Sequence, residues 1–239
     1  MLDRLTAAVF RGLSAARGKR IFHPDGVSYR ARWEPAGDAG GVVTTPASEA
    51  REVDAVVRFS RAIGLPDSTP DILGAAVKFL DAHGAGRDQD LALASSGRSA
   101  VSRHLLVPTR GFTGAVFSSI APYAAAGERV TVMAEMSDDG TPRPFEDLRA
   151  GAVPPADLHL WVEPSGRSLG TLRVGARLSD DVSRDLRFDP WHTGPGLRPI
   201  GWINRLRRPT YAASQEGRDA PAAGARPALD DASASESTR

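Results

Sequence analysis

Residues 27–34 of the chain read Val27-Ser28-Tyr29-Arg30-Ala31-Arg32-Trp33-Glu34, an alternation of apolar and polar side chains. Successive side chains of a β-strand point to opposite faces, so a period of two is typical of a half-buried strand. The segment therefore predicts a strand that buries Val27, Tyr29, Ala31 and Trp33 on one face. Its polar side chains lie on the other face.

Six further segments share the features of this strand. Each is a short apolar run bounded by Gly, Pro or Asp clusters, as in an antiparallel sheet that closes into a barrel or forms a sandwich. They are residues 52–60, 72–80, 90–95, 129–136, 157–163 and 169–178. About seven or eight strands are enough for a small closed barrel.

Helices are expected at the periphery of this barrel. Residues 112–123 and 200–206 are interpreted as helical, and residues 179–186 as a short helix with Ser179 as its N-cap. The predicted fold class is therefore α+β, an antiparallel β-barrel of about eight strands with peripheral helices.

The composition excludes several classes of protein. The chain of 239 residues has no cysteine, which rules out disulfides, thiolate metal or haem ligands and a cysteine nucleophile. A net charge of +1 gives no basic field for nucleic acid, so no nucleic-acid partner is expected. No apolar run approaches the ~20 residues that a membrane-spanning helix needs.

The chain divides into three parts by composition. Residues 1–18 are expected to form an N-terminal helix, and residues 19–218 one domain. Residues 219–239 are rich in Ala, Pro and Ser with few large apolar side chains, so a disordered tail is expected. The N-terminal segment lacks the continuous apolar run of a secretory signal, which favours a cytoplasmic protein. A peripheral membrane contact of this segment is the alternative.

Near the C-terminus the chain reads Arg207-Arg208-Pro209-Thr210-Tyr211, with an arginine four residues before a tyrosine. A phenol is neutral at pH 7 because its pKa is near ~10, and an adjacent guanidinium favours the anion. Phenolate is one of the few side-chain groups that hold haem iron. Pro209 tends to begin a helix, so the geometry between Arg207 and Tyr211 stays open. An ordinary tyrosine in an arginine-rich segment is the alternative interpretation.

Five short motifs, in this order along the chain, resemble the haem catalase superfamily. They are Arg20-Ile21-Phe22-His23-Pro24-Asp25-Gly26, Val57-Arg58-Phe59-Ser60, residues 71–79, Asp90-Leu91 and residues 188–211. The resemblance covers about residues 19–218 and is closest to the small bacterial catalase-related proteins. Allene oxide synthases are more distant. It implies a catalase-like barrel core whose cofactor is haem b, with its iron bound by a side chain of the protein.

The resemblance also implies roles for individual residues. His23 would be the distal acid–base group, with Ser60 orienting its imidazole. Tyr211 would be the axial ligand of the iron, supported by Arg207. The haem carboxylates would pair with arginines, namely Arg20, Arg58 and Arg218. The implied activity is that of a peroxidase or weak catalase acting on a small-molecule peroxide or a lipid hydroperoxide.

The sequence departs from the family pattern at the distal side. The family's asparagine should fall near Ala94-Ser95-Ser96, yet Asn204 is the only asparagine in the chain. A serine hydroxyl could donate a hydrogen bond there instead. The chain is also shorter than a full catalase, which favours slower peroxidase or hydroperoxide chemistry over rapid dismutation.

Two other functions remain open from the sequence. One is a barrel that binds haem or a lipid without turnover, which the missing asparagine favours. The other is a hydrolase or phosphodiesterase, which fits less well because no His-x-x-x-His spacing and no Gly-x-x-x-x-Gly-Lys loop occurs. A homodimer is the assembly that the sequence leaves open.

Overall fold

The alternating segment at residues 27–34 lies within β1 (Asp25–Pro35), the first strand of the computed structural model. The structure describes residues 25–37, 52–64, 69–194 and 196–201. Within them Val27, Tyr29, Ala31 and Trp33 are all buried, and Trp33 is 0% exposed. The predicted burial of this face is therefore confirmed.

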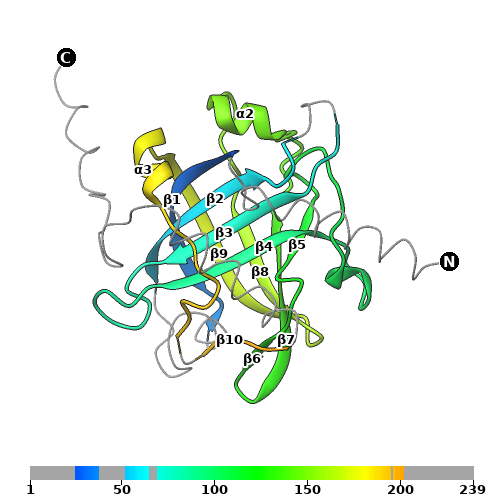
Figure 1. Cartoon of the computed structure of the whole chain (residues 1–239), viewed down its shortest axis with the longest axis vertical. Coiled ribbons are helices and arrows are strands. Elements are labelled where there is room, and N and C mark those ends of the chain that lie inside the picture. The colour runs from blue at the N-terminus through cyan, green and yellow to red at the C-terminus, as the bar shows by residue number, and fades with distance from the viewer. Residues whose placement is uncertain (1–24, 38–51, 65–68, 195, 202–239) are drawn as a thin grey trace.

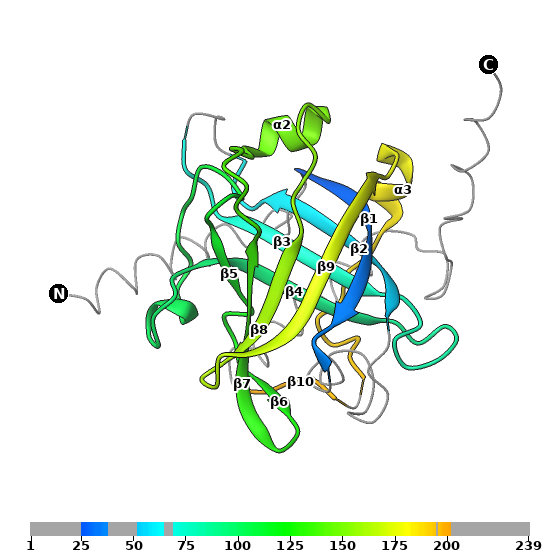
Figure 2. The ribbon, with the colours of Figure 1, turned by 180° about the vertical axis from the view of Figure 1, so that it is seen from behind.

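Eight antiparallel strands close into a barrel (Figures 1 and 2). After β1 they are β2 (Val53–Arg61), β3 (Leu73–Phe79), β4 (Gln89–Ser96), β5 (Val116–Ser118), β7 (Glu128–Met136), β8 (Leu158–Glu163) and β9 (Arg167–Arg177). Each strand pairs with the next in this order, and β9 pairs with β1 to complete the circle. The predicted fold class, an antiparallel barrel of about eight strands, is confirmed.

The barrel interior is filled by the inward side chains of these strands. Four of the contacting rings come from different parts of the chain. Trp33 meets Phe79 edge-on at 5.3 Å between ring centroids, and Phe59 meets Phe112 at 5.0 Å. Aromatic rings in such tilted arrangements contribute beyond their buried area. The interior is thus a packed core of mostly apolar side chains.

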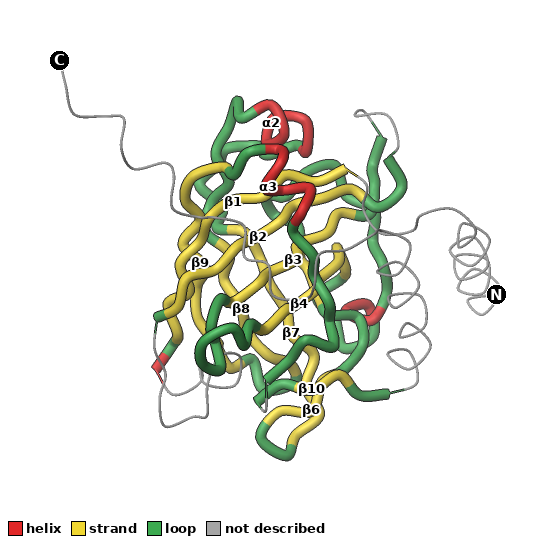
Figure 3. The backbone as a smooth tube through the Cα atoms, turned by 60° about the vertical axis from the view of Figure 1, so that its left-hand side comes forward, coloured by secondary structure: helices red, strands yellow, loops and turns green. Residues whose placement is uncertain are grey.

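Two short strands, two short α-helices and a 3-10 helix lie outside the eight strands of the barrel in the described part of the chain. β6 (Tyr123–Ala125) and β10 (Arg198–Pro199) pair with each other beside β7, at the lower end in Figure 1. Figure 3 shows α2 (Phe145–Ala150) and α3 (Asp180–Asp185), in red, at the opposite end. A short 3-10 helix, η4 (Ser102–His104), lies in the loop between β4 and β5. Among the described residues no helix combines the length and the apolar character that crossing a bilayer requires.

The predicted helices had mixed outcomes. The helix at 179–186 is confirmed as α3, and the Ser179 hydroxyl accepts a hydrogen bond from the Val182 amide. The helix at 112–123 is wrong, because that stretch holds β5 and the first residue of β6. Gly114 and Ile120 there have φ of 72° and 58°, which interrupts any helix. The sequence did not predict α2.

Other predictions fall largely outside the described residues. The helix expected at 200–206 has only residues 200 and 201 within them. The N-terminal helix at 1–18 and the tail at 219–239 also lie outside, as do both ends of the predicted domain 19–218. These boundaries stay predictions.

Gly170 on β9 generates a test of the barrel closure. It has φ of 148°, and an added Cβ would lie 2.3 Å from the Glu34 carbonyl oxygen and 2.8 Å from the Trp33 ring. We expect Gly170→Ala to lower the free energy of unfolding by roughly 2–4 kcal/mol, because both the backbone and the ring must shift. Gly175→Ala on the same strand is the control, since its Cβ would meet only the Arg30 oxygen, at 3.6 Å. Urea unfolding measures both, and equal losses would contradict the prediction.

Candidate functional site

The outer face of β1–β4 carries two neighbouring rows of mostly small side chains. Directly opposed residues of antiparallel strands share a face, so the register defines each row. One row is Gly26, Ser60, Gly74 and Ala94, and the next is Ser28, Arg58, Ala76 and Ala92. We call these eight residues the platform. Four strands about 4.8 Å apart make it about 14 Å wide.

Arg58 is the one large side chain of the platform, and it folds back over Gly26. A Cβ built on Gly26 would lie 2.3 Å from Nε, 2.6 Å from Nη2 and 2.7 Å from Cζ of Arg58. The guanidinium therefore occupies the space that any side chain at position 26 would need. This packing keeps the guanidinium close to the sheet at the β1 edge of the platform.

Ser60, the predicted orienting residue, lies on the platform beside Gly26. It is buried, with 4% of its surface exposed, and faces outward from β2. The structure thus brings Arg58 and Ser60 to one face of the barrel. The other predicted site residues lie outside the described part of the chain: Arg20, His23, Arg207, Tyr211 and Arg218.

Ala94, Ser95 and Ser96 of β4 lie where the resemblance to catalases implied an asparagine. Their environments differ. Ser95 points inward, where its hydroxyl accepts from the Leu73 amide at 3.1 Å and donates to the Val107 carbonyl at 2.7 Å. Ala94 is on the platform but has no donor group. Ser96 faces outward next to the platform and is 7% exposed. Ser96 is therefore the β4 hydroxyl on the outer side of the sheet.

Ser96 also lines a partly open hollow of about 250 Å³ beside the platform. Its walls are polar at Ser96 and Thr109, and apolar at Val107, Pro108 and Val116. The hollow is somewhat smaller than the pockets that hold drug-sized ligands, and it is large enough for a small organic molecule.

A second segment, residues 186–194 with 196–199, crosses the outer face at the lower border of the platform. We call it the strap, and in Figure 1 it runs from α3 past β3 and β4 toward β10. The Asp189 amide donates to Asp90 Oδ2 at 2.8 Å, and the Asp90 amide donates to the His192 carbonyl at 2.8 Å. The Phe188 ring centroid lies 5.7 Å from Lys78 Nζ. The strap therefore covers the ends of β3 and β4.

Under the strap, Lys78 and Asp90 form a buried ion pair with Nζ and Oδ1 2.6 Å apart. Only 12% of the Lys78 side chain and 2% of the Asp90 side chain are exposed. Burial raises the pKa of Asp90 to about 6, although the Lys78 ammonium and the Asp189 amide act in the opposite direction. A carboxyl group that titrates near neutral pH is thus built into the fastening of the strap.

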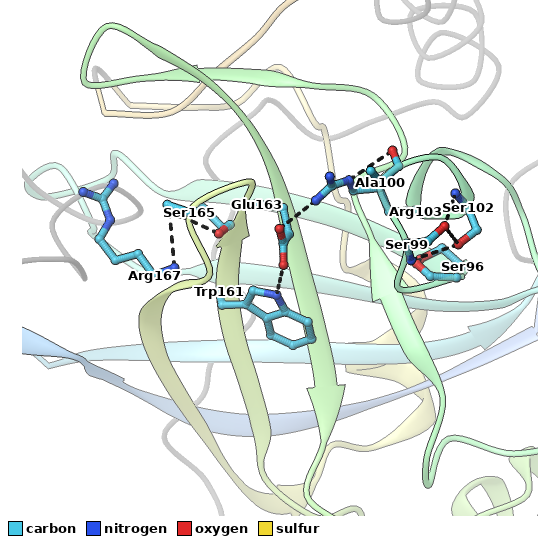
Figure 4. Close-up of polar contacts among 11 residues, drawn as sticks. Ser96, Ser99, Ala100, Ser102, Arg103, Trp161, Glu163, Ser165 and Arg167 are labelled. Carbon is cyan, nitrogen blue, oxygen red and sulfur yellow. Dashed lines mark hydrogen bonds and ion pairs between the residues drawn. The ribbon is translucent and has the colours of Figure 1, made fainter.

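The opposite border of the platform is formed by the loop between β4 and β5. Figure 4 shows Arg103 of this loop directed at Glu163 of β8, with Nη1 and Oε2 2.8 Å apart. The Trp161 indole donates to the same carboxylate at 3.3 Å, and Ser118 donates to the Arg103 carbonyl. These contacts hold the loop against β5 and β8.

A sequence pattern found in many hydrolases lies at the start of β9. Residues Gly166-Arg167-Ser168-Leu169-Gly170 match Gly-x-Ser-x-Gly. A nucleophile elbow needs its serine on a sharp turn between a strand and a helix. Here Ser168 lies inside β9, paired with Trp161, just after the turn from β8 that Figure 4 includes. The local structure does not support a hydrolase at this place.

The described residues also contain no group of three or more His, Asp or Glu side chains suited to a metal ion. Two other histidines, His104 and His159, make structural contacts. His104 Nδ1 lies 2.7 Å from the Ile120 carbonyl oxygen, and His159 stacks on Trp161.

Comparison with known proteins supports the fold. No protein-family model matches the chain, and no curated protein matches its sequence. A fungal catalase solved at 1.9 Å is structurally similar, with a TM-score of 0.58, 14% identity, and coverage of 89% of this chain. Catalase A from Saccharomyces cerevisiae has a TM-score of 0.52, 11% identity and 87% coverage. This chain spans 62% and 63% of the two catalase chains.

These similarities define the class of fold. The protein is an eight-stranded antiparallel barrel with the architecture of the catalase core. The sequence identity to both catalases is low, so the similarity shows the fold alone. The activity has to be argued from the side chains of the site.

The buried Asp90 predicts a pH dependence of stability. Its folded pKa of about 6 lies above the ~3.9 of an exposed aspartate, so the folded state binds the proton more tightly. The stabilisation from this proton is complete below pH ~3.9 and is lost as pH rises through about 6. Wild type should therefore lose more stability between pH 5 and pH 7.5 than Asp90→Asn, by about 1.4 kcal/mol.

Urea unfolding at the two pH values measures this difference. Asp181→Asn, whose side chain is 85% exposed, is the control and should keep the wild-type difference. An equal pH dependence in wild type and Asp90→Asn would contradict the prediction.

Proposed function

We propose that the protein is a haem-dependent enzyme that consumes peroxides, with haem b bound against the platform. The observation that carries the proposal is the platform itself, two rows of mostly small side chains with one arginine on the outer face of a catalase-like barrel. A planar macrocycle needs such a surface, because side chains larger than alanine would hold it away from the sheet.

The residues of the platform fit a haem group in shape and in charge. Gly74, Ala76, Ala92 and Ala94 add at most one methyl group each above the sheet, and the Arg58 guanidinium lies over Gly26 at the β1 edge. Arg58 would pair with a haem carboxylate, since a planar guanidinium binds carboxylates in a bidentate manner. Arg20 and Arg218 are proposed as further carboxylate partners on the basis of the family resemblance.

Chain connectivity supports His23 as the acid–base residue. It precedes Asp25, the first residue of β1, by two positions. Because a residue spans at most ~3.6 Å, its Cα lies within about 7 Å of the Asp25 Cα. Gly26 and Ser60 pair at the same end of the sheet. The proposal therefore has the Ser60 hydroxyl fix the tautomer of the His23 imidazole.

Tyr211 is proposed as the residue that would hold the haem iron through its phenolate, with Arg207 stabilising the anion. The last described residues lie near the β5 side of the platform, where the Ile200 amide donates to the Pro122 carbonyl at 3.0 Å. Ten residues separate Gly201 from Tyr211 and span up to about 35 Å, which is enough to return to the platform.

The bound haem would supply the iron at which the oxygen–oxygen bond of a peroxide is cleaved. His23 would take the proton from the peroxide and return it to the leaving oxygen, because an imidazole pKa near ~6.5 suits both transfers. Ser96 is the β4 hydroxyl on this side of the sheet, in place of an asparagine. We therefore propose peroxidase or weak catalase activity, on a small-molecule peroxide or a lipid hydroperoxide.

A haem- or lipid-binding barrel without turnover is the second candidate. Ala94 has no donor group and Ser95 is engaged inside the barrel, which favours this candidate. Peroxide consumption by the haem-loaded protein separates the two. The proposal further assigns the protein to the cytoplasm, as a chain that acts alone or as a homodimer.

Two substitutions test the assigned roles. We expect Tyr211→Phe to abolish the absorption spectrum of a phenolate-ligated ferric haem. His23→Ala should keep the spectrum and lower peroxide turnover by ~10²–10⁴-fold, because it removes only the proton-transfer group. His159→Ala, on the exposed stack with Trp161, is the control and should match wild type. An unchanged spectrum in Tyr211→Phe would contradict the ligand assignment.

A third substitution tests the platform. Gly26→Ala should weaken haem binding by ~10–100-fold, because the added Cβ displaces the Arg58 guanidinium and its charged hydrogen bond is worth ~1.5–3 kcal/mol. Gly175→Ala, remote on β9, should bind haem as wild type does. Fluorescence quenching by haem measures both affinities, and equal affinities would argue against a haem carboxylate at Arg58.

A further inference from the structure

The strap is fastened to the barrel at three described points along its length. Asp90 holds its start through Asp189 and His192, as described above. Gln89 Oε1 accepts the Gly194 amide at 3.2 Å and lies 2.7 Å from His83 Nε2. Beyond these points Leu197, 0% exposed, belongs to the main hydrophobic core.

Gly194 packs so closely against the His83 imidazole that only a glycine fits there. A Cβ built on Gly194 would lie 1.7 Å from Nε2 of His83 and 2.0 Å from its Cε1. A side chain here would force the imidazole away and disturb its contact with Gln89. The strap thus has one position on the barrel, defined by a glycine and two polar anchors.

The buried ion pair between Lys78 and Asp90 explains why the strap takes one position on the barrel. Replacing a buried pair by apolar residues of similar volume is often neutral or stabilising, so Lys78 and Asp90 are not the most stabilising solution. Their carboxylate instead demands a donor at one place on the strap, and Asp189 supplies it. A shift that brought Pro190 to this place would leave a buried charge without this donor, because proline has no backbone N–H. The pair therefore selects the register of the strap.

The route of the strap connects this register to the platform. The strap follows α3, whose Ser183 bonds to Ser28 of the platform at 2.8 Å. It then passes over Lys78 and Asp90, in the row next to Arg58 and Ala76. It ends beside Pro122, four residues after Ser118, which pairs with Ala94 of the platform. The chain that leads to Tyr211 therefore leaves from a point that the strap determines.

We propose that Lys78 and Asp90 act as a clasp that positions the strap, and that fastening of the strap is coupled to haem binding. This inference rests on the proposed function. Lys78 and Asp90 are positioning residues that act through the strap. Because coupling is reciprocal, haem must tighten the strap by the same factor by which a fastened strap raises the haem affinity.

Hydrogen exchange and haem affinity test the coupling on the full chain. Exchange is measured at the Asp90, Asp189 and Gly194 amides, without haem and with haem. In wild type, haem should slow exchange at all three amides. Asp90→Asn should speed exchange at Asp90 and Asp189 by about tenfold and weaken haem binding by a similar factor.

A second variant keeps the test decisive if Asp90→Asn folds poorly. Gly194→Ala alters no charge, and it should also speed strap exchange and weaken haem binding. Asp181→Asn on α3 is the matched control and should change neither quantity.

The outcomes separate this inference from the proposed function. Faster strap exchange in both variants at unchanged haem affinity overturns the coupling, and so does haem that leaves wild-type exchange unaltered. A wild type that takes up no haem overturns the proposed function and the coupling with it. In that case, exchange in the haem-free variants still decides whether Lys78 and Asp90 fasten the strap.

Discussion

The register of β1 against β2 is the constraint on which the candidate site depends. It opposes Gly26 to Ser60 and Ser28 to Arg58, and so brings the glycine and the guanidinium to one face. A shift of one residue would turn every side chain of the strand to the other face. The barrel interior prevents this shift, because Val27, Tyr29 and Trp33 must stay buried. Core packing thus fixes the outer platform without contacting it.

The fold was largely readable from the sequence because burial alternates along the strands. Seven predicted strands correspond to observed ones, since each has enough residues to display a period of two. β5 has only three residues between a glycine-rich turn and Ile120, so its pattern was too short to read. The stretch was therefore taken for a helix. α2 has no side-chain N-cap hydrogen bond and begins after a proline, so little local signal marked it.

The candidate site was readable only in part. Arg58 and Ser60 were proposed from a motif, and alternation correctly implies that they share a face. The sequence alone does not show why residue 26 must be a glycine. The requirement arises because the Arg58 side chain of the neighbouring strand lies over Gly26. The contact of the strap with Asp90 could not be predicted either, since Asp90 and Asp189 are 99 residues apart in the chain and meet only in the fold. The roles of His23 and Tyr211 stay predictions.

We propose, above all, that a planar haem lies on the outer platform. Titration of the purified chain with ferric haem, followed by its absorption spectrum, tests that claim most directly. Saturation at one haem per chain with a phenolate-ligated ferric spectrum is the result that the account predicts. Uptake that does not saturate, or a spectrum identical to that of free haem, would contradict it.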